Sequence, residues 1–124
     1  MISLDVYKLV HILGILLVFS SFGGLVLHAI NGGTKVTNVG RRLVTTSYAA
    51  GLLLILLGGF GMLARLDIVQ GGLPGWVWFK LVVWIVIGGL IALPYRKPEA
   101  SRLLWILGPA LGLLAAWAGL FKPF

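Results

Sequence analysis

Four long, nearly uncharged apolar segments divide this sequence, and they constrain its fold more than any other feature. The segments run from Leu4 to Ile30, Leu43 to Ala64, Trp76 to Leu93 and Leu103 to Phe121. An α-helix needs roughly 20 apolar residues to cross a hydrocarbon core about 30 Å thick, and each segment comes close to or exceeds that length. The sequence therefore predicts an all-α integral membrane protein, with residues 1–124 forming a single four-helix transmembrane domain.

The remaining composition excludes several classes of function. The chain has no cysteine, which excludes disulfides, thiolate catalysis and cysteine-ligated zinc or iron–sulfur sites. Its formal net charge is +7, which in a soluble protein would suggest nucleic acid as a partner. Here the basic residues gather mainly in two short loops, where membrane topology explains them. We therefore expect the chain to lie in a lipid bilayer and not to bind nucleic acid.

The loop charges also predict an orientation. The first and third connections carry Lys35, Arg41, Arg42, Arg96, Lys97 and Arg102, whereas the second has only Arg65, offset by Asp67. Basic loops stay on the cytoplasmic side, so we expect a multi-pass protein of a bacterial-type inner membrane with both termini outside. The N-terminus lacks the basic region and cleavage site of a signal peptide, so the first segment is expected to be retained.

Three ionisable side chains lie within the apolar segments: His11, His28 and Lys80. Such residues are costly in a membrane, which makes each a candidate functional residue. His28 is close to a loop and Lys80 is close to a segment end, so interfacial positions explain both equally well. His11 lies deeper. Because the first and third segments enter from the same side, His11 and Lys80 are predicted to lie at a similar depth.

Two chemistries fit a histidine and a lysine at one depth. The histidine can be an axial ligand of haem iron, with the lysine pairing a propionate or taking the other axial position. Alternatively, the pair can relay protons or hold an anionic headgroup. His11 and His28 cannot ligate one haem within a single chain, because 17 residues of helix separate them by roughly 25 Å. A bis-histidine haem would need a second protomer.

A second polar cluster is predicted at the cytoplasmic level, where His28 ends the first segment and Tyr48 lies near the start of the second. Arg41 and Arg42 adjoin it. The cluster is suited to a lipid phosphate or a haem propionate, although paired basic residues beside a span more often serve topology alone. The three carboxylates, Asp5, Asp67 and Glu99, lie far apart in sequence and form no acid–base pair.

Small residues recur at four-residue spacing in every segment. They are Ser20 and Gly24, Ser47 and Gly51, Gly88 and Ala92, and Gly108, Gly112 and Ala116. Helices in lipid associate through such small-residue faces. These faces serve either packing within the bundle or contact between copies of the chain. We expect the protein to be a homodimer or a higher homo-oligomer.

Several short motifs resemble the HemJ-type protoporphyrinogen oxidases and the related CopD-like small membrane proteins. They are "YKLVHILG" at 7–14, "RRL" at 41–43, "WFKL" at 78–81 and the closing "FKPF" at 121–124. The resemblance implies a haem-b-binding bundle, with His11 as the first-helix histidine and Lys80 as the later lysine, and a redox or porphyrin-related role. The arginine that precedes the next histidine in HemJ proteins is absent here, so haem binding carries over better than oxidase activity.

The main alternative is a membrane protein without a cofactor, in which His11 and Lys80 bind lipid, a metal ion or a partner helix. A CopD-like copper role is weaker, because two Met and two His spread along the chain make a poor copper path. The sequence identifies neither a substrate nor an electron-transfer partner.

Overall fold

A computed structural model describes residues 2–66 and 71–123. The described residues form α1 (Leu4–Ile30), α2 (Arg41–Leu66), α3 (Gly75–Leu90), α4 (Leu93–Arg96), the 3₁₀ helix η1 (Pro98–Ala100) and α5 (Ser101–Phe121). Four helical stretches, Leu4–Ile30, Arg41–Leu66, Gly75–Arg96 and Pro98–Phe121, are long and apolar enough to cross a membrane. The all-α, four-span architecture predicted from the sequence is confirmed.

The boundaries of the first span agree with the prediction, and the third span differs most. α3 ends at Leu90, and a two-residue turn separates it from α4. Pro94 contributes to this break, because it has no N–H to donate to the carbonyl of Leu90. At the other end of the chain, the hydroxyl of Ser3 caps α1 by accepting from the amide of Val6 at 3.2 Å.

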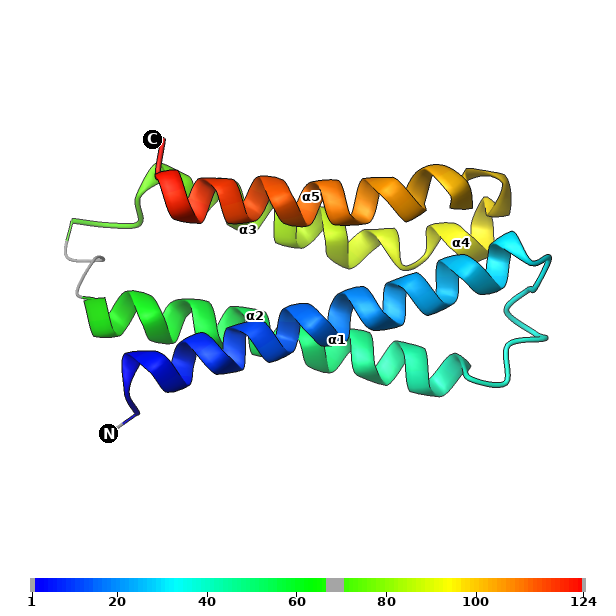
Figure 1. The fold of residues 1–124 in the computed structure, drawn as a ribbon, viewed down its shortest axis with the longest axis horizontal. Coiled ribbons are helices and arrows are strands. Elements are labelled where there is room, and N and C mark those ends of the chain that lie inside the picture. The colour runs from blue at the N-terminus through cyan, green and yellow to red at the C-terminus, as the bar shows by residue number, and fades with distance from the viewer. Residues whose placement is uncertain (1, 67–70, 124) are drawn as a thin grey trace.

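The helices form an antiparallel ring (Figure 1). α1 packs most extensively on α2 and also on α5, while α3 packs on α5. Two side chains join α2 to α3: Tyr48 donates to the carbonyl of Ile87, and Trp84 Nε1 donates to the carbonyl of Leu52 at 3.1 Å. α1 and α3 therefore lie across the bundle from each other. Both termini lie at one end, and the 31–40 loop, α4 and η1 lie at the other.

Glycines let α1 and α2 approach until their backbones touch. A Cβ on Gly14 would lie 2.6 Å from the carbonyl oxygen of Gly51, and a Cβ on Gly58 would lie 2.6 Å from the amide nitrogen of His11. Tyr7 packs its ring against Gly61 one turn further along. This contact is a small-residue helix interface of the kind that holds membrane helices together.

The glycine stripe of α5 is used inside the bundle. A Cβ on Gly108 would meet the ring of Phe22 at 2.9 Å, and one on Gly112 would meet the ring of Phe19 at 2.8 Å. By contrast, a Cβ on Gly24 of α1 would meet nothing within 4 Å. The central core combines side chains from all four spans: Val18, Phe22, Val26, Tyr48, Val83, Ile87, Leu90 and Leu104.

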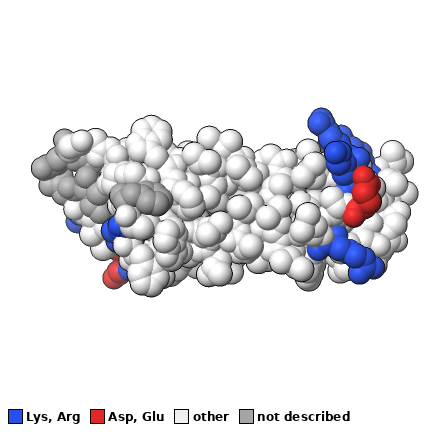
Figure 2. Space-filling model, turned by 90° about the horizontal axis from the view of Figure 1, so that it is seen from above, with Lys and Arg blue, Asp and Glu red and all other residues white. Residues whose placement is uncertain are grey.

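The outer surface of the bundle is apolar along its middle and charged near its ends. Large hydrophobic side chains remain exposed on every span, among them Leu16, Leu53, Ile85 and Leu113. Figure 2 shows lysine and arginine gathered near the two ends, with most of them at the loop end. This distribution suits a multi-pass membrane protein, whose middle faces acyl chains and whose ends face water.

Candidate functional site

His11 is held by a hydrogen bond across the α1–α2 interface. Its Nδ1 donates to the backbone carbonyl of Ile55 at 2.8 Å. A carbonyl oxygen only accepts, so Nδ1 carries the proton of the neutral imidazole and Nε2 keeps its lone pair. A histidine that ligates a metal usually donates its other ring N–H in this way, which orients the ring and selects the tautomer.

Two glycines of α2 lie next to His11. The backbone of Gly58 lies directly against His11, and a Cβ on Gly59 would lie 3.6 Å from Cε1 and Nδ1 of the ring. The His11 side chain is only half-buried. α2 therefore anchors one edge of the ring and leaves another edge accessible.

Lys80 lies near the same end of the bundle, on α3. Its Nζ would be 3.1 Å from a Cβ placed on Gly119 of α5, so the absence of a side chain at 119 gives the amine its space. Within residues 2–66 and 71–123, no hydrogen bond or ion pair engages the amine of Lys80. Lys80 and His11 lie on α3 and α1, which are across the bundle from each other.

A second lysine borders this region. Lys122 Nζ donates to the carbonyl of Gly119 at 3.1 Å and lies 5.2 Å from the centre of the Trp76 ring. The end of the bundle that holds both termini therefore carries one imidazole and two amines, with Lys80 and Lys122 both close to Gly119. Such a set is suited to an anionic group, such as a carboxylate.

His28 lies at the opposite end from His11. Its Nε2 donates to the carbonyl of Thr34 at 2.9 Å, and its ring packs on Gly33. These contacts close the end of α1 onto the loop that follows. The structure thus gives His28 a local partner and keeps the two histidines at different levels, as their separation in sequence predicts.

Tyr48 lies between those two levels. It is 3% exposed, its hydroxyl donates to Ile87 on α3, and its ring centre is 6.2 Å from that of Phe22. Arg41 is exposed at the start of α2. The five residues predicted as a site therefore fall at three levels, with His11 and Lys80 sharing one. Across the described ranges, no three His, Asp or Glu side chains gather as a metal cluster.

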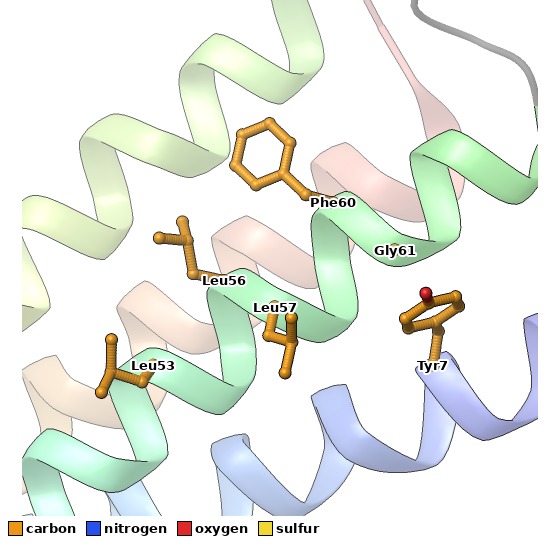
Figure 3. Close-up of a pocket in the computed structure, with 6 residues that line it drawn as sticks. All are labelled: Tyr7, Leu53, Leu56, Leu57, Phe60 and Gly61. Atoms are coloured by element: carbon orange, nitrogen blue, oxygen red, sulfur yellow. The ribbon is translucent and has the colours of Figure 1, made fainter. Parts of the chain in front are cut away.

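An apolar hollow of about 340 Å³ lies between α1 and α2 on the terminal side (Figure 3). Leucines and Phe60 project from α2, and Tyr7 of α1 lies beside Gly61. The lining is Tyr7, Leu53, Leu56, Leu57, Phe60 and Gly61. With one hydroxyl among apolar walls, this hollow suits a hydrocarbon chain and offers little for chemistry.

A larger hollow of about 740 Å³ lies at the loop end and is strongly basic. Its lining is Lys35, Arg41, Arg42, Thr45, Thr46, Ala92, Tyr95 and Arg96. Sequence reasoning selected Arg41 and Arg42 but missed the three hydroxyl residues and the contribution of α4. One feature of the sequence could have predicted this hollow: the first and third connections are both basic. They lie on the same side of the membrane because two crossings separate them.

No family model, curated protein or solved structure matches this chain. Its likeness to the HemJ and CopD-like groups therefore depends on the short motifs alone.

Proposed function

We propose that this protein is a haem-b-binding protein of a bacterial-type inner membrane, with His11 as an axial ligand of the iron. The observation that carries the proposal is the hydrogen bond from His11 Nδ1 to the carbonyl of Ile55, 2.8 Å long, which leaves the Nε2 lone pair for a metal. Ionisable residues at membrane depth are costly, which makes His11 a candidate functional residue.

The residue types around His11 are suited to a haem. Lys80 and Lys122 are cations at the same end of the bundle and suit the two propionates, while the nearby helix surfaces are apolar. A second copy of the chain would supply another His11 that could hold the same haem, in line with our expectation of a homo-oligomer. When bound, haem would supply one-electron redox chemistry; the residues described here would hold and orient it.

The proposal is tested by the absorption spectrum of the protein purified in detergent and supplemented with haem. The wild-type protein should show a Soret band, and His28→Ala should keep it because His28 is engaged with the 31–34 loop. His11→Gln should lose the band while keeping its helical circular dichroism, since glutamine still offers an N–H to Ile55 but ligates iron poorly. A wild-type protein without a band would overturn the proposal.

A second candidate role for His11, as a structural cross-link between helices, is supported by a separate observation. Trp84 and Tyr48 also donate from a side chain to a backbone carbonyl on the neighbouring helix. His11 fits this scheme as a third cross-link, in a bundle without a cofactor. One comparison separates the two candidates. The cross-link role predicts that the wild-type protein never acquires colour and that His11→Ala lowers its thermal stability.

A further inference from the structure

The basic hollow at the loop end is assembled from three separate segments. The 31–40 loop contributes Lys35, the first turns of α2 contribute Arg41, Arg42, Thr45 and Thr46, and the end of the third span contributes Ala92, Tyr95 and Arg96. Four cations and three hydroxyls thus line one concavity. A purely topological signal needs positive charge at this end of the membrane, but it needs neither a hollow nor hydroxyl groups within it.

Hydrogen bonds brace the walls of this hollow. Asn38 Nδ2 donates to the hydroxyl of Tyr95 at 2.8 Å, tying the loop to α4, and Asn38 Oδ1 accepts from the amide of Gly40 at 3.1 Å. On the loop itself, the side chain of Thr37 accepts from the amide of Thr34 at 2.8 Å. The loop is therefore tied to the rest of the rim without any ligand, and a ligand would not need to order it.

The cations of the hollow lack partners of opposite charge. Within the described part of the chain, no carboxylate lies within ion-pair distance of Lys35, Arg41, Arg42 or Arg96. The first and third connections together contain one acidic residue, Glu99, and six basic residues: Lys35, Arg41, Arg42, Arg96, Lys97 and Arg102. Figure 2 shows lysine and arginine side chains gathered at the loop end. The first amides of α2 add further positive potential.

The position of the hollow indicates that its ligand comes from the bilayer. Val36 is 90% exposed and Val39 is 104% exposed on the loop that forms one wall, and Leu43 is 72% exposed on the first turn of α2. Exposed apolar side chains on both sides of the hollow suit a rim that lies among lipid headgroups. Thr45 and Thr46 then extend the hollow about one turn below the rim, toward the acyl chains.

We propose that this hollow is a binding site for the phosphate of an anionic lipid headgroup. Arginine forks and lysine pair with the phosphate oxygens, and the threonine and tyrosine hydroxyls donate to the oxygens or to the glycerol. The site lies at the end of the molecule opposite His11, so it neither requires nor excludes haem.

The test is native mass spectrometry of the detergent-solubilised protein titrated with phosphatidylglycerol or phosphatidylcholine. The wild-type protein should bind phosphatidylglycerol at least about tenfold more tightly. Arg41→Gln with Arg96→Gln should reduce that preference by roughly tenfold or more, because each basic side chain near the surface contributes substantially to anionic-lipid binding. The matched control, Lys97→Gln with Arg102→Gln, removes the same charge from the same end outside the hollow and should keep the preference.

Two results would overturn the proposal. Equal losses in the two double variants would mean that diffuse charge, and not the hollow, attracts the lipid. Binding of inorganic phosphate alone, with the same dependence on Arg41 and Arg96 and with displacement of phosphatidylglycerol at equimolar concentration, would assign the hollow to a soluble phosphate compound. Thr45→Val with Thr46→Val keeps all charges and both side-chain shapes; a several-fold weaker preference in that variant would support direct contact with the headgroup.

Discussion

At the residue scale, the main determinants of this fold are places where a side chain is missing. Gly14, Gly51 and Gly58 let the backbones of α1 and α2 touch, and a Cβ on any of them would lie within 2.9 Å of backbone atoms on the partner helix. Apolar side chains gain little from leaving lipid for a protein interior, so dispersion at close range and occasional hydrogen bonds must hold the helices together. The His11 hydrogen bond to Ile55 depends on the same close approach.

We expect Gly58→Ala to destabilise the bundle by about 1–3 kcal/mol, because the added methyl meets backbone that cannot rotate away. Gly24→Ala is the matched control: it places the same methyl on α1 in open space and should be neutral or slightly stabilising through helix propensity. Unfolding by increasing SDS in mixed micelles, followed by circular dichroism, measures both. Similar stability of the two variants would contradict the interface described here.

At the element scale, the helix pairs are joined in two different ways. α1 and α2 meet backbone to backbone, whereas α2 and α3 are linked by long polar side chains that reach a carbonyl on the other helix. The carbonyl of Leu52 lies in the middle of α2, so Trp84 adds a second bond to an oxygen with two lone pairs, whereas the carbonyl of Ile87 lies in the last turn of α3, where Tyr48 supplies a donor. A donor without such a partner would be costly at this depth.

Tyr48→Phe should therefore lower the free energy of unfolding by about 0.5–1.5 kcal/mol, the usual contribution of a buried hydrogen bond. Tyr7→Phe is its control, since the ring of Tyr7 packs on Gly61 and its hydroxyl has no hydrogen bond within residues 2–66 and 71–123. The same SDS titration applies to both variants. If removing either hydroxyl has the same effect, the link between Tyr48 and Ile87 contributes nothing specific.

At the scale of the whole molecule, the bundle has two chemically distinct ends. One carries both termini together with His11, Lys80 and Lys122; the other carries the basic hollow, His28 and the paired loops. Separate anionic ligands can therefore occupy the two ends without contact. The positive-inside rule assigns the basic loops to the cytoplasm in our proposed orientation.

Because the chain has no cysteine, single-cysteine labelling can test this orientation against no background. Gly71→Cys lies in the second connection and Lys97→Cys in the third, and both positions are exposed. With a membrane-impermeant maleimide applied to intact cells, we expect labelling at 71 at least about fivefold stronger than at 97, with equal labelling after solubilisation. Stronger labelling at 97 in intact cells would reverse the topology.

The number of spans, their approximate ends and the gathering of charge at one end could all be predicted from the sequence. These properties depend on hydropathy along the chain and on the alternation of crossings, which need no knowledge of packing. The sequence also predicted that His11 and Lys80 share an end of the bundle, because odd-numbered spans run in the same direction. Pro94 was visible as well, although the break after Leu90, to which it contributes, became clear only in the structure.

The rotation of each helix about its own axis could not be predicted and became known from the packed bundle. In water, the apolar stripe of a helix marks its buried face, but these helices are apolar on all sides and carry no such mark. The sequence therefore did not distinguish the glycines of α5, which receive phenylalanine rings of α1, from Gly24, which faces outward. For the same reason, the acceptor of His11 and the assembly of the basic hollow from three segments emerged only when the helices were packed.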